Sequence, residues 1–162
     1  MCFERFYGDV VRYARRRVGA EMAGDVAAEV FVVAWRRIDD LVTVDNQLAW
    51  LYRVARLTVA NTVRSERRRS ALQRRAASVA GSDEASESSG GTETLAALRR
   101  LAPRDQEVLR LVAWEGLKGG NLATALGTSE AAARSRLYRA RHRYERALRA
   151  ERALTNRGEQ HG

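Results

Sequence analysis

Apolar residues recur at spacings of three and four through most of the chain, which is the period of α-helices that bury one face. In the first half of the chain this pattern predicts three helices. The first has the apolar face Phe3, Phe6, Val10, Tyr13, Ala14 and Val18, the second has Val26, Val30, Phe31, Ala34 and Ile38, and the third has Leu48, Leu51, Val54, Ala55 and Thr58. Gly19 is expected to end the first helix, because glycine readily takes the left-handed conformation found at helix ends.

The polar segment Asp39 to Gln47 is expected to join the second helix to the third. Asp45 and Asn46 are both candidates for the cap of the third helix, because their side-chain oxygens can accept hydrogen bonds from the first turn of a helix. Pro103 is the only proline in the sequence, so little interrupts the helical period. The fold class predicted for the whole chain is therefore all-α.

The second half repeats the helical pattern around a short break. Leu95, Leu98 and Leu101 start one helix, and Pro103 stands at the beginning of the next. Two further helices flank the segment Leu126-Gly127-Thr128-Ser129, and their apolar positions are Leu122, Ala123 and Leu126 in one and Ala132, Ala133, Leu137 and Ala140 in the other. Because Gly127 can end one helix and Ser129 can cap the next, the break has the form of a helix-turn-helix. This outline serves either core packing or the reading of a DNA major groove.

The composition changes abruptly between the two halves. From Ala76 to Leu98 there is no lysine or arginine, while serine, glycine and acidic residues accumulate. Such a segment buries too little apolar surface to offset its chain entropy, so residues 76–93 are predicted to form a flexible acidic linker, either as a tether only or with a second role suited to its charge. The predicted organisation is one small helical domain over residues 1–75, this linker, a second helical domain over residues 94–150, and a polar, frayed tail over residues 151–162.

The net charge of +9 favours an acidic partner, such as nucleic acid or an anionic membrane surface. Lys118 is the only lysine, and such a skew towards arginine is typical of GC-rich coding, so the placement of the charge is more informative than its total. Arginines are concentrated in the last predicted helix, which is either a solvated face or a helix that reads nucleic acid. They are Arg134, Arg136, Arg139, Arg141, Arg143, Arg146 and Arg149.

Cysteine and histidine are too rare for several classes of site. Cys2 is the sole cysteine, and His142 and His161 are far apart, so neither a disulfide framework nor a metal site is expected. No catalytic residue, metal or cofactor is predicted, and the chain is not expected to be an enzyme. The N-terminus lacks the apolar core of a signal peptide and no stretch reaches membrane-spanning length, which predicts a soluble cytoplasmic protein without membrane insertion.

Three stretches carry a family resemblance: AGDVAAEVFVVAWRR (23–37), AWLYRVARLTVANTVRSERRR (49–69) and LATALGTSEAAARSRLYRAR (122–141). In their order and spacing they resemble the extracytoplasmic-function (ECF) sigma factors of the sigma-70 family. The two predicted domains then correspond to sigma region 2 and to the helix-turn-helix domain, sigma region 4. The resemblance implies a protein that binds the beta and beta-prime subunits of core RNA polymerase, recognises the −10 and −35 promoter elements and helps to open promoter DNA. Many members of the family are held by an anti-sigma factor, which is a further partner that the resemblance suggests.

The resemblance also assigns residues to three surfaces. The residues that match the polymerase-binding helix are Asp25, Glu29, Val30, Phe31 and Trp35. The residues that match the part binding the −10 element, together with the segment 39–47, are Trp50, Arg53, Arg56, Arg64, Arg67, Arg68 and Arg69. The residues that match the part binding the −35 element are Ser129, Glu130, Arg134, Ser135, Arg136, Arg139, Arg141 and Arg143. Within the last set the best candidates for base or phosphate contacts are Arg134, Ser135 and Arg139, because arginine offers a forked donor that suits guanine edges and phosphates.

Several of these assignments have a structural alternative. Phe31 and Trp35 are candidates for the core as well as for partner contacts, and Trp50 either packs inside the domain or stacks near unpaired bases. The cluster Arg64 to Arg69 is either a phosphate-binding patch or a solvated face. Arg146 and Arg149 are expected at a solvated helix end.

The sequence departs from the family pattern at four places. Ala28 and Leu57 replace a glutamine and an asparagine, and Leu57 bears on base recognition near the −10 element. Gly119, Gly120 and Asn121 lie in LKGGNLA, which replaces the family's Leu-Ser-Tyr-x-Glu-Ile-Ala entry to the helix-turn-helix; each glycine is expected to cost up to about 1 kcal/mol in a helix interior, and Asn121 replaces a glutamate. Residues 131–133, all alanine, replace a glycine, a threonine and a valine. These changes predict a region 4 that docks loosely or prefers an unusual upstream element.

Two other functions remain open on the sequence. One is a helix-turn-helix DNA-binding regulator that does not act with core polymerase, and the other is a degenerate sigma-like interaction protein that starts no transcription. A further hypothesis concerns the linker: neutralising Asp83, Glu84 and Glu87 is expected to alter initial transcription or promoter escape, which abortive-product assays measure.

Overall fold

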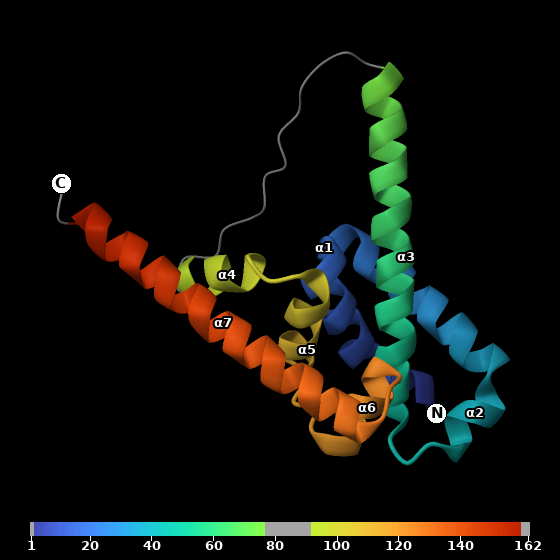
Figure 1. Ribbon diagram of the computed structural model, residues 1–162. Coiled ribbons are helices and arrows are strands. Elements are labelled where there is room, and N and C mark those ends of the chain that lie inside the picture. Colours follow the sequence, from blue (N-terminus) through green and yellow to red (C-terminus); the bar gives the residue numbers. More distant parts are fainter. Residues whose placement is uncertain (1, 77–91, 160–162) are drawn as a thin grey trace. The chain divides into compact units, whose positions relative to one another are not determined.

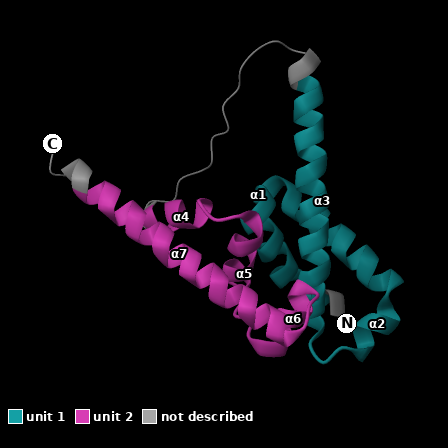
Figure 2. Ribbon diagram, viewed as in Figure 1, with its two compact units in different colours: residues 1–83 teal, residues 84–162 magenta. Residues whose placement is uncertain are grey.

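The computed structural model describes residues 2–76 and 92–159, and within these ranges all the regular elements are helices. In chain order they are α1 (Cys2–Arg36), α2 (Ile38–Thr43), α3 (Gln47–Ala76), α4 (Thr92–Arg99), α5 (Pro103–Ala113), α6 (Gly119–Leu126) and α7 (Glu130–Glu159) (Figure 1). The all-α prediction is therefore confirmed. The chain divides into two compact units, residues 1–83 and 84–162 (Figure 2). Most of the predicted linker, with Asp83, Glu84 and Glu87, lies outside the described residues.

The first unit is built around the packing of α1 against α3. Helical conformation in α1 is broken at Gly19, with φ 82° and ψ 173°, so the predicted end of the first helix is confirmed. Helix resumes at once, and α1 thus consists of two helical arms with separate apolar faces. Tyr13 is fully buried and stacks on Tyr52 of α3 with ring centroids 5.2 Å apart. The guanidinium of Arg17 covers the Tyr13 ring at 3.4 Å from its centroid.

The polar connection predicted between the second and third helices contains a helix of its own, α2. Arg37, with φ −120° and ψ 38°, separates α1 from α2 and forms an ion pair with Asp40, whose Oδ2 lies 2.7 Å from Nε. Because the helix axis changes there, Ile38 does not continue the buried face of α1 as predicted and is 43% exposed. Leu41, only 1% exposed, occupies the core instead. At the start of α3, Asn46 Oδ1 accepts a hydrogen bond from the Ala49 N–H at 2.9 Å, so Asn46 is the cap.

The second unit is arranged around α7, against which α4, α5 and α6 all pack. Pro103 occupies the first turn of α5, where its missing N–H leaves no bond unmade. The Gln106 side chain donates to the Leu101 carbonyl at 2.9 Å and thereby joins the end of α4 to α5. The buried side chains of this unit include Leu98, Leu101, Val108, Leu111, Leu117, Leu122 and Ala140.

The predicted frayed tail is wrong for residues 151–159, because α7 continues through Glu159. Two ion pairs support this extension from the region of α4. Glu151 pairs with Arg100, directly after α4, and Arg152 Nε lies 3.8 Å from Glu93 Oε2. The partner charges come from residues far earlier in the chain, so the polar composition of the tail did not indicate that it would be helical. None of the described helices is both long enough and apolar enough to cross a lipid bilayer.

Candidate nucleic-acid interface

The turn between α6 and α7 has the geometry of a helix-turn-helix. Gly127 ends α6 in the left-handed conformation, with φ 64° and ψ 43°. The N–H groups of Gly127 and Thr128 donate to the carbonyls of Thr124 and Ala123, at 3.1 and 3.0 Å. Ser129 Oγ accepts from the Ala132 N–H at 3.3 Å and caps α7. Both local predictions, for Gly127 and for Ser129, are confirmed, and the turn fixes where the exposed N-terminal end of α7 begins.

The two glycines before this motif do not lie in a helix interior, so the expected cost there is wrong. α6 begins at Gly119, which places Gly119 and Gly120 in its first turn. Gly119 has φ 49°, a conformation that residues with a Cβ rarely adopt. A Cβ at this position would lie 3.5 Å from Glu130 Oε1 of α7. Glycine therefore suits the start of α6, and Asn121 is exposed on the same helix.

The predicted DNA-binding residues of α7 do not share one environment. At about 100° per residue, Arg134, Ser135 and Arg139 lie on the side turned away from the buried Ala133 and Ala140. All three are exposed, as are the Ser129 cap and Glu130 in the first turn. Arg134 Nη2 lies 3.4 Å from Glu130 Oε1, a pair within the same helix face. Arg134, Ser135 and Arg139, together with Tyr138 and His142, form what we call the outward face of α7.

Tyr138 and His142 were not predicted as part of the site. Tyr138 is 64% exposed, and its ring meets the His142 ring edge-on with centroids 4.5 Å apart. The spacing could have indicated this pair, because Tyr138 follows Arg134 by four residues and precedes His142 by four. An exposed aromatic ring between cationic side chains can contact a thymine methyl group or a sugar.

Three other predicted arginines of α7 lie on its flanks. Arg143 Nη1 forms an ion pair with Asp105 Oδ2 of α5 at 2.7 Å. Arg141 borders an apolar groove between α4, α5 and α7, and Arg136 is exposed. The structure thus brings Arg143 to a protein carboxylate and Arg141 to a protein groove, whereas Arg134 and Arg139 point to solvent.

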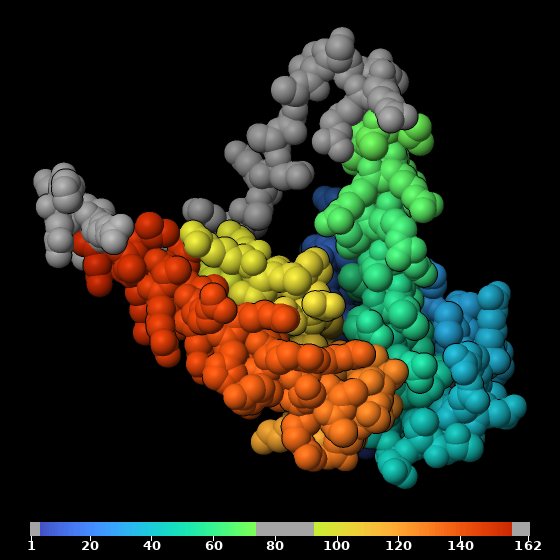
Figure 3. All heavy atoms as spheres, viewed as in Figure 1, coloured from blue at the N-terminus to red at the C-terminus, as the bar shows by residue number. Residues whose placement is uncertain are grey.

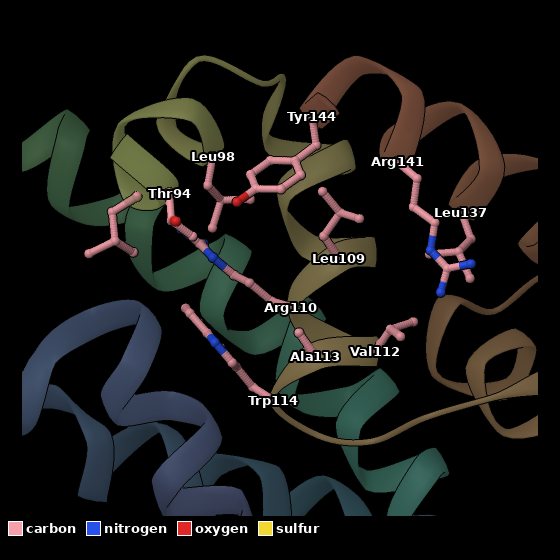
Figure 4. A pocket seen from close by; sticks show the side chains of 11 residues that line it. Thr94, Leu98, Leu109, Arg110, Val112, Ala113, Trp114, Leu137, Arg141 and Tyr144 are labelled. Carbon is pink, nitrogen blue, oxygen red and sulfur yellow. The ribbon is translucent and has the colours of Figure 1, made fainter. Parts of the chain in front are cut away.

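The groove beside Arg141 is a feature that the sequence did not indicate. It has a volume of about 300 Å³ and an apolar lining that includes Leu95, Leu98, Leu109, Val112, Leu137 and Tyr144 (Figure 4). Arg110 and Trp114 border it, with the guanidinium 5.4 Å from the indole centroid. Leu137 was predicted as core, and it is half-buried in this groove wall. The groove combines an apolar floor with cationic borders.

In the first unit, the predicted polymerase-binding residues divide into exposed and buried groups. Asp25 and Glu29 are exposed on the second arm of α1, and Trp35 is 81% exposed. Phe31 is half-buried beside the Tyr7 ring, with centroids 6.1 Å apart. Val30 is completely buried. The arm therefore presents two carboxylates and an indole, with Val30 holding the arm on the core.

The predicted −10-binding residues also divide. Trp50 is only 5% exposed, and the Arg37 guanidinium lies 5.9 Å from its ring centroid. The structure places Trp50 in packing, which was one of its two interpretations. Arg53 is exposed and Arg56 half-buried on α3, and the neighbouring Leu57 is 51% exposed.

The basic cluster Arg64, Arg67, Arg68 and Arg69 lies on the second half of α3, where all four residues are exposed. Arg69 pairs with Glu66 at 3.2 Å. In the space-filling view this green part of α3 protrudes from the rest of its unit (Figure 3). A protruding helix with a high density of guanidinium groups suits a phosphate backbone. Over residues 2–76 and 92–159, no group of three or more His, Cys, Asp or Glu side chains is placed to hold a metal ion.

Comparisons with known families agree with the division into two units. A family model described as Sigma-70 region 2 matches residues 2–69. A second model, described as Sigma-70 region 4, matches residues 92–143. The first match covers α1 to most of α3, and the second covers α4 to the first half of α7.

Curated relatives show the same family. The ECF RNA polymerase sigma factor BldN of Streptomyces coelicolor is 32% identical over 146 residues, which cover 85% of this chain and 55% of the relative. The probable RNA polymerase sigma factor RfaY of Xanthomonas campestris is 35% identical over 127 residues, which cover 72% of this chain and 32% of the relative. The chain thus spans about half and about a third of the lengths of these two relatives.

Two solved structures share the fold. One is the sigma factor RpoE in complex with the anti-sigma factor NepR from Bartonella quintana, with a TM-score of 0.63 and 20% identity over 91% of this chain and 94% of that one. The other is CnrH in complex with the cytosolic domain of CnrY, with a TM-score of 0.58 and 24% identity over 92% and 86%. With region 2 and region 4 matched in order and a relative 32% identical, the chain belongs to the sigma-70 family of RNA polymerase sigma factors, in its extracytoplasmic-function group.

Proposed function

We propose that the chain acts as a sigma factor that binds core RNA polymerase, recognises the −10 and −35 promoter elements and helps to open promoter DNA. The observation that carries the proposal is the placement of the two family matches. Region 2 falls on the first unit and region 4 on the second, and each unit presents an exposed arginine-rich helix. A single DNA-binding module would need only one of them.

The outward face of α7 is the proposed reader of the −35 element. The Gly127 turn and the Ser129 cap leave the N-terminal end of α7 exposed, as a helix that enters the major groove requires. Arg134 and Arg139 can donate two hydrogen bonds each to a guanine edge or a phosphate. Ser135 and Tyr138 lie between them and supply a hydroxyl and an aromatic ring.

The first unit is the proposed site for core polymerase and for the −10 element. Asp25, Glu29 and Trp35 form the exposed part of the second arm of α1, and such a combination of an aromatic anchor with charged neighbours is typical of interface hot spots. Arg53, Leu57 and the basic cluster of α3 offer phosphate contacts and one apolar contact to the unpaired strand. Trp50 is buried, and its ring lies beside the Arg37 guanidinium. Its proposed role is therefore to hold Arg37 in place for the ion pair with Asp40 of α2.

The chain belongs to a family of transcription initiation factors, which bind a polymerase and do not themselves form bonds. We therefore propose that this chain has no active site of its own. The bond-forming chemistry would be that of the polymerase. Because core RNA polymerase works in the bacterial cytoplasm, the proposed function implies that this chain acts there too. The two solved relatives are complexes, one of them with an anti-sigma factor by name, which makes an anti-sigma partner a proposal for this chain as well.

Core binding separates this function from a regulator that uses only the helix-turn-helix. In a binding assay with labelled full-length chain, the double variant Asp25→Lys, Glu29→Lys should bind purified core polymerase at least about tenfold more weakly, because interface charges are reversed. The matched control Glu145→Lys reverses an exposed carboxylate of α7 and should leave core affinity unchanged. A wild-type chain that binds duplex DNA but not core polymerase would establish the regulator instead. A chain that binds core polymerase but starts no transcription would be the degenerate interaction protein.

A further inference from the structure

Asp105 is the one charged residue that is buried in the described part of the chain, with 6% of its surface exposed. It lies in the first turn of α5, and its Oδ2 is 2.7 Å from Nη1 of Arg143, 38 residues further along the chain in α7. A carboxylate removed from water needs a compensating partner. Arg143 supplies it from a side chain that is itself 47% exposed.

This pair differs from the Arg134–Glu130 pair in the N-terminal half of α7. Arg134 pairs with Glu130 one turn earlier in the same helix, which leaves the orientation of α7 unaffected. The Asp105–Arg143 pair instead joins α7 to a different helix. It therefore resists rotation of α7 about its own axis relative to α5.

The packing of α7 leaves room for such a role. Within the described range the fully buried side chains of α7 are the short ones of Ala133 and Ala140, while the larger Leu137 and Tyr144 are only half-buried beside α4 and α5. Apolar contact through alanine fixes the distance between helices better than it fixes their rotation. A buried polar pair with one allowed geometry is a known means of specifying register.

A rotation of α7 at Arg143 would also move the outward face, because both lie on the same helix. At about 1.5 Å per residue, Arg139 and Arg134 lie roughly 6 Å and 14 Å along the axis of α7 from Arg143. A small rotation of α7 about its axis would move both guanidinium groups away from the base edges that they would contact in the proposed DNA complex. Arg143, whose own guanidinium is held by Asp105, is poorly placed to contact a phosphate.

We propose that Asp105 and Arg143 are positioning residues: their ion pair sets the rotation of α7 on α5 and so aligns the outward face with DNA. Arg143 contributes no phosphate contact of its own. The inference rests on the proposed DNA binding by region 4, and it changes the role that the family resemblance gives to Arg143.

The test uses full-length chain, a duplex enriched by the wild-type protein from a random library, and a scrambled duplex of the same length. Binding is measured by fluorescence anisotropy over a series of salt concentrations for Asp105→Asn, Arg143→Gln, the double variant and the control Arg139→Gln. The slope of log affinity against log salt reports the number of phosphates that the protein neutralises, at about 0.9 for each phosphate. The ratio of the two affinities reports alignment with bases.

A positioning pair predicts that Asp105→Asn and Arg143→Gln each lower the preference for the enriched duplex by about tenfold, the reduction expected for one misaligned base pair. Both should keep the wild-type salt slope, and the double variant should be no worse than either single one. Arg139→Gln should lower both the preference and the slope. The proposal is overturned if Arg143→Gln lowers the slope while the preference stays, or if Asp105→Asn leaves the preference unchanged.

Thermal unfolding of each variant shows whether that variant is folded at the temperature of the binding assay. Should Asp105→Asn be unfolded at the assay temperature, the slope and preference of Arg143→Gln alone decide between the two roles. Should the wild-type chain enrich no duplex and bind none, DNA binding by region 4 is wrong and the positioning role falls with it. In that case, non-additive unfolding temperatures in the two single variants and the double one would still show that the pair joins α5 to α7.

Discussion

Trp35 is 81% exposed at the end of the second arm of α1, an unusual position for an indole in a water-facing helix. If it anchors core polymerase, Trp35→Ala should weaken core binding by about tenfold or more, since truncated hot-spot aromatics cost that much. The free energy of unfolding should change by less than about 0.5 kcal/mol, because the side chain is outside the core. Competition binding to core polymerase and thermal unfolding measure the two quantities.

Tyr138 is tested for DNA binding in the way that Trp35 is tested for core-polymerase binding. Tyr138→Ala should lower the affinity of the chain for its enriched duplex by about fivefold, since the variant has no aromatic ring to place against DNA, and should leave core-polymerase affinity unchanged. Tyr138→Phe, which keeps the ring that meets His142, should retain most of the DNA affinity. Equal affinities for all three proteins in a fluorescence anisotropy titration would remove Tyr138 from the DNA-binding face.

Residues that act through local hydrogen bonds were predictable from the sequence. Asn46, Gly127 and Ser129 satisfy backbone groups within a few positions of themselves, so the residue type and its neighbours are sufficient information. Asp105 and Trp50 were not predictable in the same way. The burial of both depends on helices that are distant in sequence, and nothing adjacent to them marks it.

At the scale of the element, Gly19 decides the shape of α1. Its φ of 82° and ψ of 173° lie in a region that is almost exclusive to glycine, so Gly19→Ala should destabilise the first unit by about 1–3 kcal/mol. Gly24→Ala is the matched control, because Gly24 lies within helical α1 with open space around it and alanine there should stabilise by up to about 1 kcal/mol. Urea unfolding of the two variants should therefore shift in opposite directions, and a shared direction would contradict this account of α1.

The extension of α7 past residue 150 is expected to support α4. A chain truncated after Ala150 lacks Glu151 and Arg152 and therefore both ion pairs, to Arg100 and to Glu93. Partly exposed pairs contribute modestly, so the second unit should be destabilised by about 1–2 kcal/mol, and amide exchange in α4 should accelerate. Truncation after Asn156 keeps both pairs and should change neither measurement. Unchanged exchange in α4 after truncation at Ala150 would show that the extension is dispensable.

The helices themselves were mostly predictable, because their apolar periods are long and regular. The exceptions are α2 and the end of α7. The six residues of α2 are too few to display a period, and Leu41 alone joins them to the core. The end of α7 is polar on most sides, so its helical state depends on charges supplied by α4 and by Arg100 after it. In both places tertiary contacts determine a structure that local composition does not indicate.

On the scale of the whole molecule, two units with different surfaces are present on one chain. The first presents carboxylates, an exposed indole and a protruding basic helix, and the second presents a helix-turn-helix with an arginine-rich outward face. Their order was predictable, since each family motif lies within one unit and keeps its place along the sequence. The groove bordered by Arg110 and Arg141 was not, because its walls come from three helices that meet only in the folded unit.

Promoter-directed initiation by this chain can be measured by run-off transcription from fragmented genomic DNA of the host. The reaction contains purified core polymerase and the full-length chain, and the RNA 5′ ends are then mapped. We expect defined start sites that core polymerase alone does not use, preceded by two shared sequence elements at a constant spacing. Trp35→Ala should reduce transcription from all of these sites together, whereas Tyr138→Ala should reduce it most at sites with the weakest upstream element. Binding of the chain to core polymerase without any new start site would show that it is not an initiation factor.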